Sequence, residues 1–301
     1  MMNRLNTAAG RAARANAEGC PSRTVDLHVH STFSDGVKTP EELCHMARKT
    51  GVEILALCDH DSTGGVEQMR EMLADTDITF IPGVEVSTGA GGNTHILCYG
   101  ENVRSPEMTR FLMELAQERI QRAAEMIRLL AREGAVIPEE KREALLSSSS
   151  VGRPHIARAL IETGAVNTVK QAFDRYLAQG RPAYVPRRLL PTAEAVETLS
   201  RMKVLTVLAH PVRMNLEHEA LHALVRSLQA CGLRGLEAWH PSASSKAAAQ
   251  IDRLARECRL LVTGGSDYHG DAGSTVQMGR LPSGWQERSR DMEALLASLM
   301  L

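Results

Sequence analysis

Short runs of apolar residues alternate along the chain with longer amphipathic stretches. The apolar runs have the length and the β-branched content of strands, and they cover residues 24–30, 52–60, 78–88, 94–100, 203–211, 233–241 and 260–270. Segments with helical spacing cover residues 40–51, 64–75, 216–232, 245–259 and a final stretch near 288–300. Alternating strand and helix patterns predict an α/β fold.

Residues 105–188 interrupt this alternation because they contain no strand-like run. Apolar residues recur there at helical spacing, as at Phe111, Leu115 and Leu130. We interpret this block as a mainly helical insertion domain. It divides the α/β part into a first portion, residues 23–104, and a second portion, residues 189–301.

The first 22 residues are rich in Arg and Ala and almost free of acidic residues. A transit peptide has a similar composition, but this stretch lacks a clear hydrophobic or amphipathic stripe. We therefore expect a disordered tail over residues 1–22.

Several strand-like runs carry polar side chains of the kind that bind metal ions. His28 and His30 lie two residues apart in "DLHVHSTFSDG", so a β-strand would point both to the same side. His95 and His210 lie on otherwise apolar runs, where a neutral core histidine is the ordinary alternative. The carboxyl ends of the strands of a parallel barrel meet at one face, so we expect these residues to converge there.

Histidines mixed with carboxylates, without cysteine, suit Zn, Mn or Fe, whereas Mg and Ca prefer oxygen ligands alone. The candidate ligands are His28, His30, Asp35, His60, Glu85, His95, His210, Asp267 and His269. This set is too large for one ion, so we expect two or three divalent transition metal ions, with Glu85 bridging between two of them. Ions held in such a cluster assist displacement at phosphorus, which predicts a multinuclear hydrolase.

Composition excludes several other classes of protein. The 35 Lys and Arg residues nearly balance the 36 Asp and Glu residues, so no overall basic charge indicates DNA binding. The six cysteines form no CxxC pair, which favours reduced thiols and a cytoplasmic location. No apolar run approaches the ~20 residues of a membrane helix.

Five motifs occur in a fixed order: "DLHVHSTFSDG", "LCDHDS", "GVEVS", "AHP" and "GSDYH". Together they resemble the PHP (polymerase and histidinol phosphatase) superfamily over residues 25–280. The resemblance implies a distorted (β/α)7 barrel that uses three metal ions, usually Mn, Fe or Zn, to hydrolyse phosphoesters. It implies one ion held by His28, His30, Glu85 and Asp267, a second by Asp35, His60 and His269, and a third by Glu85, His95 and His210.

The segment 152–186 narrows the resemblance to a subfamily with a helical insertion. It implies a phosphatase that removes the 3'-phosphate of a nucleoside 3',5'-bisphosphate, with a nucleoside monophosphate as another small target. Cyclic ribose-phosphate hydrolysis and exonuclease action at RNA 5' ends are the alternatives, as is a regulatory module that keeps its metals only as a scaffold. Histidinol phosphatases tend to have histidine in place of Asp35, which argues against that activity.

We expect the substrate to be a small phosphorylated nucleotide or sugar, with short RNA as a further partner. The expected phosphate-binding residues are Arg153, His155, Arg181 and Arg187, since an arginine can grip a phosphate with two hydrogen bonds. The related subfamily leads us to expect lysine where this chain has Arg187. For catalysis we select Asp267, His269 and His155, and the two histidines are the alternatives for the general acid.

Two further groups of polar residues need an interpretation. The sequence "HEALH" at 218–222 matches the zinc-protease pattern HExxH, but its helix places His218 and His222 opposite the apolar stripe, so we predict a solvated face. Glu237 and His240 end another strand-like run and could support the site or contact the substrate.

Overall fold

Seven strands form one sheet, and each strand is hydrogen-bonded to the next one in the chain. The computed structural model describes residues 24–89, 94–271, 274–285, 295–297 and 299. The strands are β1 (Val25–Val29), β2 (Ile54–Leu57), β3 (Thr79–Thr88), β4 (Thr94–Tyr99), β5 (Leu205–Leu208), β6 (Gly235–Trp239) and β7 (Leu261–Gly264). All seven fall within the runs predicted to be strands.

The sheet closes nearly into a barrel because the end of β1 meets the segment after β7. Asp267 N–H donates to the carbonyl of His28, and His30 N–H donates to the carbonyl of Tyr268, at 2.8 and 2.9 Å. Val29 and Tyr268 form a parallel bridge at the same place. The predicted distorted (β/α)7 barrel is therefore confirmed.

β4 runs antiparallel to both of its neighbours, β3 and β5, whereas the other pairs are parallel. The wholly parallel barrel assumed from the alternating pattern is wrong at this strand. The connection from β3 to β4 is short, and only an antiparallel pair can be joined so directly.

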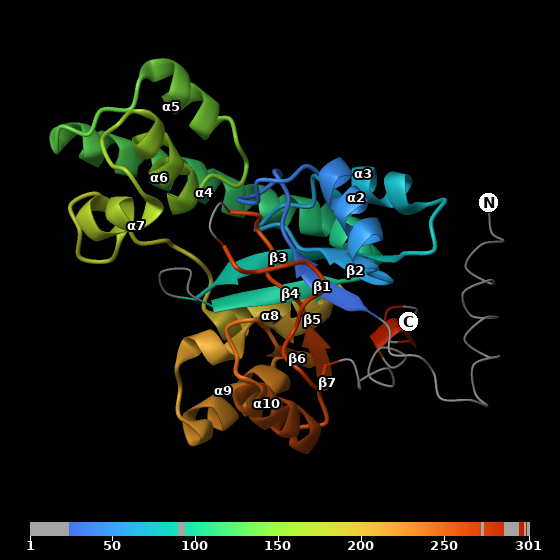
Figure 1. The fold of residues 1–301 in the computed structure, drawn as a ribbon. Helices are drawn as coiled ribbons and strands as arrows, with labels where there is room; N and C mark the ends of the chain where they lie inside the picture. The colour runs from blue at the N-terminus through green and yellow to red at the C-terminus, as the bar shows by residue number, and fades with distance from the viewer. Residues whose placement is uncertain (1–23, 90–93, 272–273, 286–294, 298, 300–301) are drawn as a thin grey trace, which may run out of the picture.

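Helices cover the outside of the barrel (Figure 1). They are α2 (Pro40–Thr50), α3 (Val66–Leu73), α8 (Thr192–Arg201), α9 (His218–Ala230) and α10 (Ser245–Glu257), with the short turns η2 (Glu101–Arg104) and η4 (Pro211–Met214). The start of α2 shows why a helix begins there, since Thr39 and Glu42 form a reciprocal capping box. The pattern analysis did not predict α8, and the tail at 1–22 and most of the helix expected near 288–300 lie outside the described residues.

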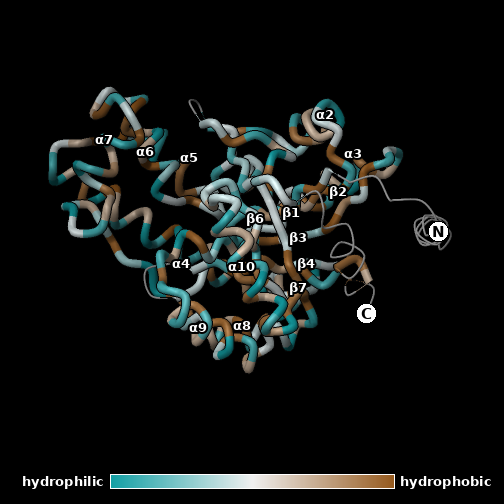
Figure 2. Tube along the Cα trace, turned by 60° about the horizontal axis from the view of Figure 1, so that its bottom comes forward, coloured by the Kyte–Doolittle hydropathy of each residue, from teal (hydrophilic) through white to brown (hydrophobic). Residues whose placement is uncertain are grey.

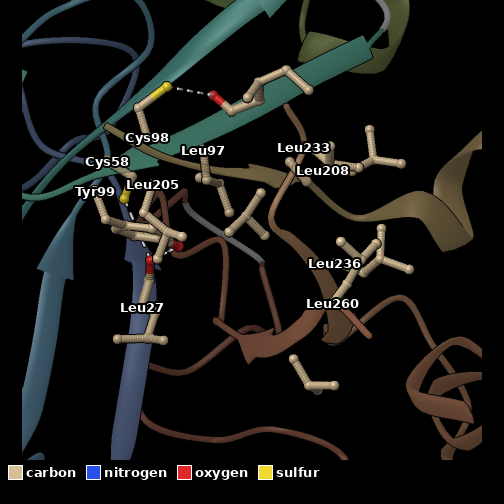
Figure 3. Packing of buried hydrophobic residues seen from close by; sticks show 14 of the residues in the cluster. Leu27, Cys58, Leu97, Cys98, Tyr99, Leu205, Leu208, Leu233, Leu236 and Leu260 are labelled. Atoms are coloured by element: carbon tan, nitrogen blue, oxygen red, sulfur yellow. Dashed lines mark hydrogen bonds between the residues drawn. The ribbon is translucent and has the colours of Figure 1, made fainter. Parts of the chain in front are cut away.

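The barrel core is built from apolar side chains of both halves of the chain. Leu27, Leu97, Leu205 and Leu236 belong to one buried cluster (Figure 3). A buried polar group of this cluster forms a hydrogen bond where the Tyr99 hydroxyl donates to the carbonyl of Leu27 at 2.8 Å. Hydrophobic segments gather accordingly around β3, β4 and β7 (Figure 2).

The helical block between β4 and β5 contains α4 (Pro106–Arg132), α5 (Glu139–Leu146), α6 (Arg153–Glu162), α7 (Val169–Ala172) and η3 (Phe173–Leu177). It projects from one side of the barrel (Figure 1). Met126, Leu130, Ile156, Leu160 and Leu177 belong to an apolar core of its own. The first half of α4 packs instead on the barrel, because its Met108, Leu112 and Leu115 belong to the barrel core.

Candidate metal centre and phosphate pocket

His28 and His30 converge at the carboxyl end of β1, as the alternation of side chains on a strand requires. Both are fully buried, and their Nε2 atoms lie 3.0 Å apart. His30 Nε2 also lies 3.1 Å from Asp267 Oδ1, which follows β7. Glu237 on β6 accepts from Nδ1 of His28 at 2.9 Å, so the Nε2 atom faces the cluster. From the sequence, Glu237 was expected either to support the site or to contact the substrate. The structure places it in contact with His28, whose imidazole it orients.

Glu85 on β3 lies at the centre of the cluster and is fully buried. Its Oε2 lies 3.2 Å from His28 Nε2, 3.3 Å from His30 Nε2 and 2.9 Å from His60 Nδ1. Its Oε1 lies 2.9 Å from His95 Nδ1 and 3.0 Å from His210 Nε2. The two oxygens therefore face two different sets of histidines, as a bridging carboxylate would.

Asp35, His60 and His269 form a second group beside the first. His269 Nε2 lies 3.2 Å from Asp35 Oδ1, and His60 Nε2 lies 3.9 Å from Asp35 Oδ2. His30 joins this group, since its ring is stacked on that of His269 with the centroids 4.1 Å apart. Asp35, His60 and His269 are partly exposed, whereas the first group is almost completely buried, so these three residues are the more accessible part of the cluster.

His95 reaches the cluster for a reason that differs from the predicted one. It lies at the beginning of β4, opposite Ser87 near the end of β3. Because β4 is antiparallel, its amino end lies at the face where the parallel strands have their carboxyl ends. His210 follows β5 with a left-handed backbone (φ 30°), which a residue with a side chain rarely adopts.

Ligand atoms lie close enough together for metal coordination in three sets of residues. These are His28, His30, Glu85 and Asp267; His30, Asp35, His60 and His269; and His60, Glu85 and His95. Three buried atoms of the cluster, Asp35 Oδ1, His60 Nδ1 and Glu85 Oε2, have no hydrogen-bond partner among the described residues. Buried polar atoms without hydrogen bonds are costly, so this donor set fits divalent cations.

The charges of the cluster point to the same conclusion. Burial alone would raise the pKa of Glu85, but the surrounding histidines, His60 and His95 foremost, hold it well below its usual value. Burial would lower the pKa of His269, but Asp35 and Asp267 raise it to about 10. The carboxylates thus stay charged and hold positive charge beside them, whether protons or metal ions.

Two aspartates beside His60 have other partners. Asp59 accepts from Ser31 Oγ and Ser34 Oγ at 2.6 and 2.5 Å, so it orders the loop after β1 instead of joining the ligands. Asp61 contacts Arg119 Nε and the guanidinium of Arg187 at 2.7 and 3.3 Å. Neither Asp61 nor Arg119 was predicted from the sequence to belong to the site.

A pocket of about 320 Å³ lies between the cluster and the insertion. Asp35, His60, His95, His210, Asp267 and His269 line the barrel side, and Arg119, Arg122, Arg153 and Arg187 line the side formed by α4, α6 and the returning segment. Burial and the neighbouring Arg153 and Arg187 lower the pKa of Arg122 to about 10. Within the described residues neither Arg122 nor Arg153 forms an ion pair, so the pocket holds uncompensated positive charge suited to an anion.

The predicted phosphate-binding residues divide into two groups. Arg153 and Arg187 line the pocket, and the Arg153 guanidinium lies over the rings of Phe173 and Tyr184 at 5.4 and 5.9 Å. Arg181 is exposed and does not line the pocket. His155 does not line it either, because Nδ1 accepts from Gly152 N–H and Nε2 donates to the carbonyl of Ser34.

Other residues singled out in the sequence lie away from the chemistry. His218 and His222 are exposed on α9, whose buried residues are Leu221, Val225 and Leu228. Of the cysteines in the described residues, Cys231 is partly exposed and the rest are buried, and all are unpaired. Among the helices of the described segments, none has both the length and the apolarity that crossing a membrane requires.

Comparison with known proteins agrees with this site. The PHP domain family matches residues 26–183, more than half of the chain. A 5'-3' exoribonuclease of Haemophilus influenzae is 33% identical over 273 residues, covering 90% of this chain and 95% of the relative. A 3',5'-nucleoside bisphosphate phosphatase of Chromobacterium violaceum is 32% identical, covering 84% and 90%.

A solved structure shows the same fold. It is described as a putative metal-dependent phosphoesterase from Bifidobacterium adolescentis, and it aligns with a TM-score of 0.79 at 26% identity, covering 92% of this chain and 97% of its own. Family model, relatives and fold agree over most of the chain. We conclude that the chain belongs to the PHP domain family and is a metal-dependent phosphoesterase.

Proposed function

We propose that the chain hydrolyses the phosphoester at the 3'-oxygen of a nucleotide while the insertion arginines hold the 5'-phosphate. The main substrate in this proposal is a nucleoside 3',5'-bisphosphate. The observation that carries it is the pocket itself, which has candidate metal ligands on one wall and Arg122 and Arg153, free of ion pairs among the described residues, on the other. Such a pocket offers two separate sites for negative charge.

The relatives support this division of roles. One relative is named as a phosphatase of nucleosides that carry phosphates at both the 3' and 5' positions. The other is named as a 5'-3' exoribonuclease. In our proposal the same contact for the 5' side of the nucleotide serves either activity in this chain. Short RNA is therefore the second candidate substrate, and the 33% identical relative is the observation that favours it.

In this proposal the first metal group is His28, His30, Glu85 and Asp267, the second Asp35, His60 and His269, and the third Glu85, His95 and His210. Bound Mn, Fe or Zn ions would neutralise phosphoryl oxygens and lower the pKa of water toward neutrality. The arginines place the scissile phosphate by holding the other one, so binding energy at the remote phosphate orients the reacting ester. Asp267 and His269 act at the pocket as ligands, and we no longer assign a general acid to His155, because both of its ring nitrogens are hydrogen-bonded.

The test compares the catalytic efficiency for a nucleoside 3',5'-bisphosphate with that for the 3'-monophosphate. We expect the wild type to prefer the bisphosphate and Arg153→Ala to lose the preference. A charge-assisted contact of this kind contributes roughly 1.5–3 kcal/mol, which corresponds to about tenfold to somewhat over a hundredfold in efficiency. Metal content should stay unchanged in this variant.

Arg181→Ala is the matched control, because Arg181 lies on the same insertion but is exposed and does not line the pocket. It should keep the preference of the wild type. Equal efficiencies for the two substrates in the wild type would contradict the proposal and favour hydrolysis of a monophosphate or a cyclic phosphate.

A further inference from the structure

Three side chains of the insertion donate hydrogen bonds to main-chain carbonyl groups of the barrel loops. Ser150 Oγ donates to the carbonyl of His60 at 2.6 Å. Arg158 Nη2 donates to the carbonyl of Asp35 at 2.7 Å. His155 Nε2 donates at 2.8 Å to the carbonyl of Ser34, the residue before Asp35.

These bonds converge on one metal group. Asp35 and His60 both belong to the set that also contains His30 and His269, and His60 is in addition shared with the set of Glu85 and His95. Asp35 lies in the loop after β1, not on a strand, so the sheet does not fix its backbone. The other buried set is held inside the barrel, as where Glu237 fixes His28. Among the candidate ligands of the described residues, Asp35 and His60 are the two whose main-chain carbonyls accept these hydrogen bonds from the insertion, and Asp35 occurs in one set alone.

The local structure of α6 orients two of these three donors, His155 and Arg158. Pro154 stands in its first turn, and Gly152 N–H donates to Nδ1 of His155 at 3.1 Å. With Nδ1 accepting, the ring proton lies on Nε2, which is the atom that donates to Ser34. Arg158 follows His155 by three residues and so lies on the same face of the helix. The Arg158 side chain also forms an ion pair with Asp271, whose Oδ1 lies 2.8 Å from Arg158 Nη2.

We infer that Ser150, His155 and Arg158 are positioning residues that hold Asp35 and His60 in place for metal binding. The affinity of this one metal group is therefore set by the insertion from outside the barrel. The inference rests on the metal-dependent function proposed above, and it concerns neither the substrate nor the chemical step. Removing a group that orients metal ligands typically weakens metal binding about 10- to 100-fold.

The experiment measures Mn²⁺ binding to the full chain after metal removal with a chelator, by equilibrium dialysis and elemental analysis without substrate. We expect Ser150→Ala and Arg158→Ala each to weaken one equivalent of bound Mn²⁺ about 10- to 100-fold and to leave the other equivalents unchanged. Arg158→Lys should recover most of the loss, because lysine keeps a donor for the carbonyl of Asp35.

Glu162→Gln is the matched control, because Glu162 lies on the same helix and pairs with Lys141 inside the insertion. It should bind Mn²⁺ like the wild type. Unchanged binding in Ser150→Ala and Arg158→Ala would overturn the inference, as would an equal weakening of every equivalent. A wild type that binds no Mn²⁺, Fe²⁺ or Zn²⁺ would overturn the proposed function as well, so the two failures can be told apart.

Discussion

Asp61 Oδ2 accepts a hydrogen bond from Arg119 Nε at 2.7 Å, and both side chains are buried. This contact joins the loop after β2 to the middle of α4. Arg187 adds a second guanidinium to the same oxygen at 3.3 Å. Asp61 therefore lies between two arginines that would otherwise repel each other at the wall of the pocket, and Arg187 also pairs with Glu118 at 3.0 Å.

Asp61→Asn should lower the free energy of unfolding by about 2–3 kcal/mol, because it leaves two arginines without their common counter-charge. This loss of stability is smaller than the loss for an ion pair that is fully buried away from solvent, because Arg119 and Arg187 line the pocket. Urea denaturation measures it. Asp174→Asn, which removes an exposed partner of Lys170, is the control and should leave the unfolding midpoint unchanged. Equal stabilities of Asp61→Asn and the wild type would show that the two arginines do not need this carboxylate.

Glu85→Gln should lose more bound metal than a substitution of any single histidine in the cluster. Its two carboxylate oxygens face different histidines, and a neutral imidazole offers only one lone pair, so only the carboxylate can serve two ions. Elemental analysis of Glu85→Gln beside His30→Asn tests this. We expect the first to lose about two equivalents and the second about one. The same loss in both variants would argue that Glu85 is not a bridge.

Metal binding should release protons from the cluster. Burial opposes the charged form of His269, but Asp35 and Asp267 raise its pKa to about 10, and the carboxylates of Glu237 and Glu85 likewise raise the pKa of His28 well above its usual range. Both imidazoles are protonated near neutral pH in the metal-free protein, and metal binding requires the neutral form. The apparent affinity should therefore rise as the pH rises toward 10. Calorimetry in two buffers with different heats of ionisation would reveal the protons, and identical heats in both would refute the prediction.

His218→Ala and His222→Ala should leave both metal content and phosphoesterase turnover unchanged. Both histidines are exposed on α9, whose buried face is formed by Leu221, Val225 and Leu228. Elemental analysis and a turnover assay provide the check. A lost equivalent of metal in either variant would mean that the HExxH pattern binds an ion after all.

Much of the fold follows from local patterns, because strands and helices differ in the period of their apolar residues. The seven strands and the helical insertion could be predicted in this way. The direction of β4 could not, since an apolar run looks the same in either direction. His95 nevertheless lies near the cluster, because an antiparallel strand brings its amino end to the same face.

The arginines that line the insertion side of the pocket could be predicted only in part from the sequence. They are Arg119, Arg122, Arg153 and Arg187. Arg119 and Arg122 were overlooked because arginines on a long helix are normally exposed. A signal was present, however, since they continue the buried stripe of α4 that contains Leu112, Leu115 and Met126. Charged residues at apolar positions of a helix indicate that the facing surface is polar. His155 was overvalued for the opposite reason, since its position beside Arg153 suggested substrate binding, whereas its ring nitrogens bind main-chain groups.

α4 belongs to two hydrophobic cores, because Leu112 packs in the barrel and Met126 packs in the insertion. A continuous helix has no joint at which one part could swing against the other. Substrates must therefore enter and leave the pocket beside an insertion whose position relative to the barrel is fixed. Exchange of the insertion core between related proteins would require a junction in the middle of α4. Chimeras joined within α4 should preserve its helical phase, because adding or deleting a single residue would rotate Arg119 and Arg122 about 100° relative to the barrel.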